Sequence, residues 1–299
     1  MMNTVEVSHI TKTFGDTRAV DDLTFAVERG EIFGLLGPNG AGKTTAIRIL
    51  LDIFKPDGGS VAILGGPMTE AKKNHIGYMP EERGLYQDSV LEGCLVYLGT
   101  LKGLSAAEAR KRVAVQLERF ELAEHKSKKV KELSKGMQQK AQLIATLVHQ
   151  PELLIIDEPF TALDPINTQM IKDLMHDLRR DGVTILMSTH QMHQVEELCD
   201  RILLIDHGRK LLYGSLDDIR KQYSGHAVLV RPEGELPTLE GIEAITQVNS
   251  TVKMSLAAGI SPQEILKALL AKKVILEKFE IAVPTLDEIF IRAVAEAAS

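Results

Sequence analysis

Apolar and polar positions alternate along the first part of the chain in a way that predicts strands and helices in turn. The stretches 4–10 and 18–28 read as alternating strands, and the apolar run 31–36 ends in a glycine-rich turn that leads into a helical pattern. Beyond residue 150 strands and helices alternate, with strands at 152–157, 183–188 and 201–206 and helices at 167–180 and 191–199. This alternation predicts parallel βαβ units and a sheet covered by helices on both faces.

The middle of the chain has a different, helical character. Short strands are expected at 61–64 and 75–79, and the region from 90 to about 120 reads as two helices interrupted near residue 102. Ser105 is the expected cap of the second helix, and a further helix is expected to begin near Ser134. We therefore expect a helical subdomain at about 85–150.

The pattern shifts near residue 223. A turn or loop is expected at 231–237, followed by strands at 244–248 and 251–256, a helix, a strand at 274–282 and a final helix. The two helices begin at matches to the capping box, Ser261 with Glu264 and Thr285 with Glu288. We predict a main domain at 1–223 and a small accessory α+β domain at 225–299.

Composition narrows the class of protein. The chain has 299 residues, a net charge of −6, two cysteines, no tryptophan and 4% aromatic residues. A negative net charge does not fit a protein that binds the phosphate backbone, so no nucleic acid partner is expected. Two cysteines are too few for a disulfide framework or a metal cluster. Neither a run of roughly 20 apolar residues nor a signal segment is visible, so we expect a cytoplasmic protein.

A phosphate-binding loop is predicted at residues 37–44, where Gly37-Pro38-Asn39-Gly40-Ala41-Gly42-Lys43-Thr44 fits the pattern GxxxxGK[ST]. Backbone N–H groups of such a loop cradle phosphate oxygens, and glycine lets the chain approach them closely. Lys43 would reach the β- and γ-phosphates, Thr44 would bind Mg²⁺, and Thr45 would lie beside it. The alternative is a glycine-rich turn that binds nothing, but the strand before it and the helix after it favour ATP.

A pair of acids follows the apolar strand 152–157. Asp157 at the carboxyl end of this strand can hold Mg²⁺, and Glu158 can polarise a water that attacks the γ-phosphate as a general base. A strand followed by a charged turn is the plainer interpretation of this pair alone. The phosphate loop upstream favours the catalytic one.

Between these motifs lies Leu133-Ser134-Lys135-Gly136-Met137-Gln138-Gln139, which resembles the LSGGQ signature of ABC ATPases. Thr161-Ala162-Leu163-Asp164 resembles the D-loop of that family, and Ser188-Thr189-His190 resembles its switch histidine. The resemblance, which covers residues 1–220, implies a P-loop NTPase fold of ABC type, with a mixed sheet core, an antiparallel β part and a helical subdomain. It also implies that Ser134, Gly136 and Asp164 contact ATP and that His190 contacts the γ-phosphate.

Two further assignments rest on the same resemblance. Phe14 stands where the family places an aromatic residue that stacks on adenine, and Glu81 stands where it has the Q-loop glutamine. Glu81 could ligate Mg²⁺ beside Thr44 and Asp157. Lys135, Met137 and Glu81 depart from the family pattern, and we expect Glu81 to alter how ATP binding is relayed to a partner.

The resemblance finally implies a mechanism and its partners. In ABC ATPases the signature of one cassette completes the ATP site of another, so a homodimer or paired cassette with two ATP molecules is expected. The segments 80–86 and 284–290 are similar to segments of the ATPases of ABC-2 type exporters. This similarity implies separate membrane-spanning permease subunits at the inner face of the membrane. Residues 85–120 are the expected docking surface for them. The alternatives are a soluble ABC ATPase of translation or DNA repair and a nucleotide sensor that does not hydrolyse ATP.

Overall fold

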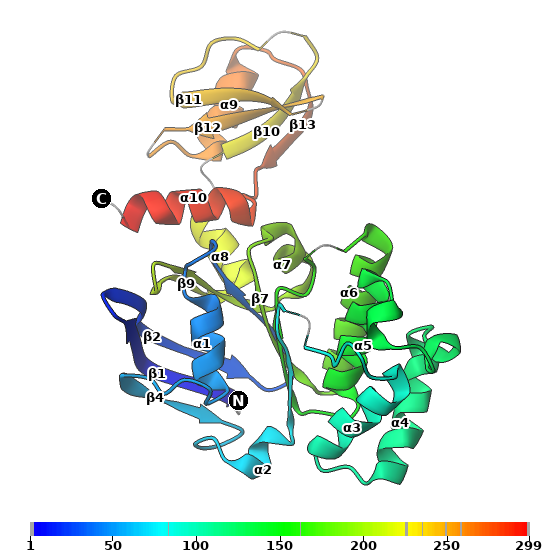
Figure 1. The fold of residues 1–299 in the computed structure, drawn as a ribbon. Coiled ribbons are helices and arrows are strands. Elements are labelled where there is room, and N and C mark those ends of the chain that lie inside the picture. The colour runs from blue at the N-terminus through cyan, green and yellow to red at the C-terminus, as the bar shows by residue number, and fades with distance from the viewer. Residues whose placement is uncertain are drawn as a thin grey trace. The chain divides into compact units, whose positions relative to one another are not determined.

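The computed structural model describes residues 3–82, 84–161, 163–224, 227–234, 236–248, 250–257 and 259–297 (Figure 1). The chain divides into two compact units, Met1–Tyr213 and Gly214–Ser299. This boundary lies earlier than the predicted one at 223, because helix α8 (Leu216–Tyr223) packs within the second unit. The Tyr223 hydroxyl lies 3.3 Å from a carboxylate oxygen of Glu296 in helix α10 (Leu286–Ala297). Arg83 and Ala162, which fall in two of the predicted motifs, lie outside the described residues.

A six-stranded sheet forms the centre of the first unit. Its order is β5-β6-β7-β3-β8-β9, and the first five of these strands run parallel. The strands are β3 (Ile32–Leu36), β5 (Ile76–Met79), β6 (Leu153–Asp157), β7 (Thr184–Thr189), β8 (Arg201–Asp206) and β9 (Arg209–Ser215). Strands β3, β6 and β7 are buried throughout, as their continuous apolar runs predict for a sheet that is covered on both faces.

A second, antiparallel sheet and one helix complete the core on one side. The sheet has the order β2-β1-β4, formed by β1 (Asn3–Phe14), β2 (Thr17–Glu28) and β4 (Gly58–Ile63). Helix α1 (Lys43–Leu50) buries Ala46, Ile47, Ile49 and Leu50 in one cluster with residues of both sheets. Helix α1, drawn in blue in Figure 1, begins at Lys43 shortly after β3 ends at Leu36, so the core holds the start of this helix near the end of a buried strand.

Helices cover the rest of the first unit. Helix α5 packs against β5, α6 against β7 and α7 against β3. Ser105 caps α4 by accepting a hydrogen bond of 3.2 Å from the N–H of Glu108, and α3, α4 and α5 form the helical part, as predicted. The helices of this unit are α1, α2 (Glu70–Lys73), α3 (Leu91–Leu101), α4 (Ala106–Arg119), α5 (Lys135–Leu147), α6 (Pro165–Arg180) and α7 (Met192–Leu198), with 3-10 turns η1 (Ala123–His125) and η2 (Val130–Glu132).

The second unit contains a four-stranded antiparallel sheet of order β11-β12-β10-β13. Its strands are β10 (Ala227–Pro232), β11 (Ile242–Val248), β12 (Thr251–Leu256) and β13 (Leu276–Ile281), and helix α9 (Pro262–Ala271) packs on it through Ile265 and Leu269. Both predicted capping boxes are present, since Ser261 and Glu264 exchange hydrogen bonds, as do Thr285 and Glu288. The α/β fold class and the small α+β unit are confirmed, whereas β10 extends into the segment that was predicted to be a loop.

None of the helices in the described parts of the chain combines the length and apolar character that a membrane span requires.

Replacing Leu269 by alanine should destabilise the second unit selectively. Leu269 is 0% exposed in the core under α9, and emptying such a site costs about 2–5 kcal/mol of unfolding free energy. Hydrogen exchange of the β10 and β12 amides, followed by mass spectrometry, should show faster exchange in Leu269→Ala. The neighbouring Leu270→Ala is the matched control, because Leu270 is 58% exposed. Equal exchange in both variants would contradict this packing.

Candidate functional site

The carboxyl ends of three neighbouring strands bring the predicted motifs to one edge of the central sheet. Leu36 at the end of β3 pairs with Thr189 of β7, and Asp157 at the end of β6 pairs with Ser188 of β7. The loop 37–42 continues from β3, so it lies beside Asp157 and beside the residue that follows Thr189. Parallel strands always end at the same edge, and ligands of α/β proteins bind there.

The loop that follows β3 depends on glycine at two positions. Gly37 has φ of 152° and Gly42 has φ of 104°, and an added Cβ would come within 2.2 Å of the Ile205 carbonyl oxygen at Gly37 and of the Ala19 carbonyl oxygen at Gly42. Gly40 has φ of 81° but open space around it. The loop therefore packs closely against β8 at Gly37 and against β2 at Gly42, and it is exposed at Gly40.

Lys43 is the first residue of α1, and its side chain turns back into the loop. Its ammonium donates to the carbonyl oxygen of Gly37 at 2.8 Å and to that of Pro38 at 3.1 Å. It also lies 3.6 Å from a carboxylate oxygen of Glu158, and both side chains are buried. This cation at the centre of the loop is where a phosphate group would find its counter-charge.

Asp157 is held by two hydroxyl groups. Thr44 donates from Oγ1 to Oδ2 of Asp157 at 3.0 Å, and Ser188 donates from Oγ to Oδ1. Asp157 is 1% exposed, and a buried carboxylate requires such partners. Burial raises the pKa of the neighbouring Tyr78 hydroxyl, and the negative charge of Asp157 adds to that shift.

Glu158 takes an unusual backbone conformation, with φ of 52°. Its N–H lies 3.1 Å from the carbonyl oxygen of Ser188 and 3.3 Å from the Ser188 hydroxyl. Thr189 donates from Oγ1 to Oε2 of Glu158 at 3.3 Å, and Nδ1 of His190 lies 3.0 Å from Oε1. The turn after Asp157 thus aims the second carboxylate toward Lys43 and His190.

A cavity of about 390 Å³ opens at this edge of the sheet. Most of its lining had been predicted from sequence, and the structure adds Ala19 to it. The lining residues are Ala19, Asn39, Gly40, Gly42, Lys43, Thr44, Thr45, Glu81 and Glu158. The loop, the catalytic candidate Glu158 and Glu81 therefore line one pocket. His190 is hydrogen-bonded to Glu158, and Asp157 is hydrogen-bonded to Thr44.

The signature and D-loop candidates lie outside this pocket. Ser134 caps α5 by accepting a hydrogen bond from the N–H of Met137 at 3.3 Å, and its side chain is exposed. Asp164 caps α6 by accepting from the N–H of Asn167 at 2.9 Å, and hydrogen bonds from Asn167 hold the pKa of Asp164 below its usual value. A Cβ at Gly136 would lie 3.5 Å from the Asn167 amide nitrogen, so the two helix starts are neighbours.

Phe14 also lies outside the cavity lining. Its ring is 44% exposed at the end of β1 and packs edge-on against Phe54, with ring centroids 5.4 Å apart. Lys12 places its ammonium 5.6 Å from the centre of the Phe14 ring. An exposed aromatic face remains available for stacking, so the adenine assignment stays a prediction.

The donor set fits a magnesium ion that is shared with a phosphate group. Thr44 and Asp157 offer adjacent oxygen atoms, which Mg²⁺ prefers, and Glu81 lines the same cavity. Within the described part of the chain, no group of three or more His, Cys, Asp or Glu side chains could hold a metal alone. A protein site with few ligands suits Mg²⁺, which usually keeps water and substrate phosphate as its other ligands.

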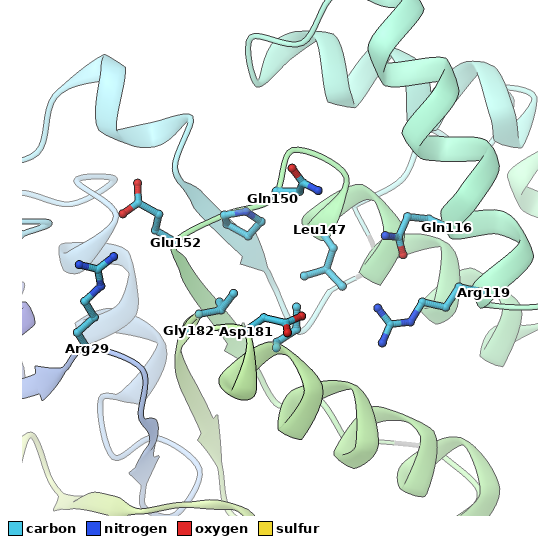
Figure 2. Close-up of a pocket in the computed structure, with 11 residues that line it drawn as sticks. Arg29, Gln116, Arg119, Leu147, Gln150, Glu152, Asp181 and Gly182 are labelled. Atoms are coloured by element: carbon cyan, nitrogen blue, oxygen red, sulfur yellow. The ribbon is translucent and has the colours of Figure 1, made fainter.

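A second cavity, of about 400 Å³, lies at the opposite ends of β6 and β7. Figure 2 shows Arg29 and Glu152 at one end of it and Gln116 and Arg119 at the other. None of the residues expected to bind ATP or Mg²⁺ lines this cavity. The cavity beside Lys43 is therefore the one that contains residues expected to bind a nucleotide.

Sequence reasoning quoted Ser188 and Thr189 without giving either a role. Their hydroxyl groups hold both acidic side chains, and the signal that could have found them is their position directly before His190 at a strand end. Gln139 and Gln142 of α5 were also missed. Both reach the backbone of pocket loops, and such long-range contacts have no local sequence pattern.

Comparison with known proteins agrees with this geometry. A family described as ABC transporter matches residues 20–161, and a family described as ATP-binding protein DrrA1-3-like, C-terminal domain, matches residues 214–294. The uncharacterised ABC transporter ATP-binding protein YhaQ of Bacillus subtilis is 43% identical over 291 residues, covering 96% of this chain and 97% of that protein.

Two further likenesses cover much of the chain. Nod factor export ATP-binding protein I of Cupriavidus pinatubonensis is 38% identical over 255 residues, covering 84% of this chain and 78% of that protein. A solved structure of the ATP binding subunit of an ABC transporter matches with a TM-score of 0.69 and 34% identity, covering 74% of this chain and 93% of that one. With the phosphate loop, the acid pair and the signature helix in place, the chain belongs to the ABC transporter ATP-binding proteins, a family of ATP-hydrolysing transport ATPases.

Proposed function

We propose that this chain is the ATPase subunit of an ABC-2 type exporter, that two copies dimerise around two ATP molecules, and that separate permease subunits carry the transported compound. The observation that supports dimerisation is the position of Ser134. It lies exposed at the start of α5, outside its own pocket, where it is available to a second chain. The export assignment follows the relative named for Nod factor export and the matched DrrA1-3-like domain.

The contacts in the pocket support a role for several of its side chains. Lys43 and the loop N–H groups would bind the phosphates, while Thr44, Asp157 and Glu81 would hold Mg²⁺. When bound, Mg²⁺ supplies positive charge to the phosphate oxygens. This donor set supports binding of the ATP phosphates together with Mg²⁺, and a second chain would add further contacts.

Hydrolysis requires a base beside the γ-phosphate. Glu158 would accept a proton from the attacking water while the bond from the γ-phosphorus to the bridging oxygen breaks and ADP leaves with that oxygen. His190 at 3.0 Å holds the Glu158 carboxylate in place and can contact the transferred group. Loss of the γ-phosphate would remove the contact that joins the two chains, so the dimer would open after each turnover.

A shallow groove on the helical part is suited to a permease segment. Tyr86, Val90 and Tyr97 are 52%, 44% and 50% exposed, and the rings of Tyr86 and Tyr97 pack edge-on with centroids 6.0 Å apart. Together with Ser89, Gly93 and Cys94 they line a cavity of about 470 Å³. The first residue of this tyrosine groove, Tyr86, follows Glu81 closely along the chain. A permease bound in the groove would therefore contact the segment that also carries a residue of the ATP pocket. Docking there would hold the chain at the cytoplasmic face of the membrane.

Alanine at Gly42 should remove ATP binding, whereas alanine at Gly40 should weaken it less. Both positions have positive φ, which costs a side chain about 1–2 kcal/mol, but only Gly42 also has a backbone oxygen 2.2 Å from the added Cβ. Titration with a fluorescent ATP analogue should show a Kd at least tenfold higher for Gly42→Ala than for Gly40→Ala. Equal affinities for the two variants, both folded by thermal melting, would rule out the proposed cradle.

Glu158→Gln should trap the ATP-bound dimer. The amide keeps the shape of the side chain but cannot accept the proton, so hydrolysis should slow by roughly 100-fold or more while ATP binding persists. Light scattering with saturating ATP and Mg²⁺ should show a dimer, and the same sample with ADP should remain monomeric. A monomer under both conditions would refute the proposed ATP-dependent dimer.

The trapped variant should also retain its membrane partner. Purified from gently solubilised cells with ATP and Mg²⁺, Glu158→Gln should carry a polytopic membrane protein in roughly equal amount. Adding Tyr97→Arg should remove that protein by placing a charge in the tyrosine groove. Ile291→Arg is the matched control, since Ile291 is 67% exposed on α10 and lies outside the docking region 85–120. Ribosomes, nucleic acid or no partner at all would overturn the transport assignment and leave the ATPase assignment standing.

A further inference from the structure

The backbone on both sides of Glu81 is hydrogen-bonded by one buried side chain, that of Gln142. The amide nitrogen of Gln142 donates to the carbonyl oxygen of Pro80 at 3.1 Å and to that of Glu82 at 3.3 Å. These two carbonyl groups belong to the residues on either side of Glu81. Gln142 is 6% exposed, so water competes little for these bonds.

The segment that carries Glu81 follows the end of β5 at Met79, and α3 begins at Leu91. Its later part is held by the loop before α5, since the N–H of Lys131 donates to the carbonyl oxygen of Gln87 at 3.0 Å. The Gln142 contacts lie nearer the pocket, directly beside Glu81. Glu81 itself is exposed and lines the ATP pocket. The Gln142 amide bonds the residues on both sides of Glu81, so it acts directly on where this carboxylate lies in the pocket.

Helix α5 makes a similar contact with the segment that follows the second pocket carboxylate. Gln139 precedes Gln142 by one helical turn and so lies on the same side of the helix. Its amide nitrogen donates to the carbonyl oxygen of Pro159 at 2.8 Å, directly after Glu158. One rigid helix thus holds the backbone beside Glu81 and beside Glu158, while its first turn presents Ser134.

We infer that Gln142 is a positioning residue for ATP hydrolysis, which acts by fixing Glu81 in the pocket and by tying it to the helix that begins at Ser134. This inference rests on the proposed function, in which Ser134 serves the ATP site of the second chain. A displacement of α5 at the partner's ATP would then move Glu81 in the chain's own pocket. Each ATP site would be coupled to the other through the Gln142 amide.

A double-mutant cycle separates this role from a general effect on stability. Gln142→Met keeps the length and burial of the side chain but removes the donor, so kcat should fall about tenfold while KM changes less than about twofold. In a Glu81→Ala background the same substitution should lower kcat less than about twofold, because the group that Gln142 positions is already absent. Thermal melting of each variant shows whether the fold is kept.

Thr146→Val provides the matched control on the same helix. Thr146 is 5% exposed, and its hydroxyl donates to the backbone oxygen of Gln142 at 2.8 Å, so its hydrogen bond stays within α5. Its effect on kcat should be the same with and without Glu81. Where Gln142→Met fails to fold, Gln142→Glu keeps the side-chain length and replaces the donor by an acceptor.

The outcomes separate the inference from the function on which it rests. An unchanged kcat in Gln142→Met, or an equal fold-loss with and without Glu81, would overturn the positioning role while the parent chain remains an ATPase. A Glu158→Gln chain that stays monomeric with saturating ATP and Mg²⁺ would instead overturn the proposed dimer, whatever the kcat of the Gln142 variants. A tenfold loss that disappears in the Glu81→Ala background would establish that Gln142 acts through Glu81.

Discussion

The carboxylate of Asp157 is buried at the point where β6, β7 and the phosphate loop meet, and the rest of the site depends on how this charge is satisfied. An ionised carboxylate out of water is costly unless hydrogen bonds replace its hydration. Thr44 of α1 and Ser188 of β7 supply those bonds, one to each carboxylate oxygen. Because the carboxylate and its two hydroxyl donors come from three separate segments, satisfying one charge brings the loop, the acid pair and the histidine strand into register.

The residue after Asp157 shows what that register makes possible. A left-handed conformation costs a side chain roughly 1–2 kcal/mol, and Glu158 adopts one with φ of 52°. Bonds from its N–H to Ser188 and from Thr189 to its carboxylate offset this cost. The sharp turn lets two adjacent residues face different partners, since Asp157 is directed to Thr44 and Glu158 to Lys43 and His190. Two consecutive carboxylates in an ordinary extended strand would point to opposite faces of the sheet.

Much of this arrangement could be predicted from sequence because its signals are local. The phosphate loop, the strand before Asp157 and the caps at Ser105 and Ser261 each depend on a few neighbouring residues. Strand β10 was not predicted, because the proline and glycine cluster after it obscured where the strand ends, and its pairing with β12 and β13 is non-local. The unit boundary was placed too late because the contact of α8 with α10 joins segments far apart in the chain.

Three residues depart from the family pattern, and the consequence of each depends on whether its backbone or its side chain contributes to the site. Met137 contributes its backbone N–H to the Ser134 cap, so a change of side chain at this position leaves the start of α5 intact. Lys135 is exposed in the first turn, where its charge faces outward rather than into the pocket of its own chain. Glu81 differs from both, because its side chain lines the pocket, where it adds a negative charge near Glu158. Lys43 already lies beside Glu158, so the charge that Glu81 adds is in excess of the cation the pocket holds, and it should favour ATP bound together with Mg²⁺ over ATP alone.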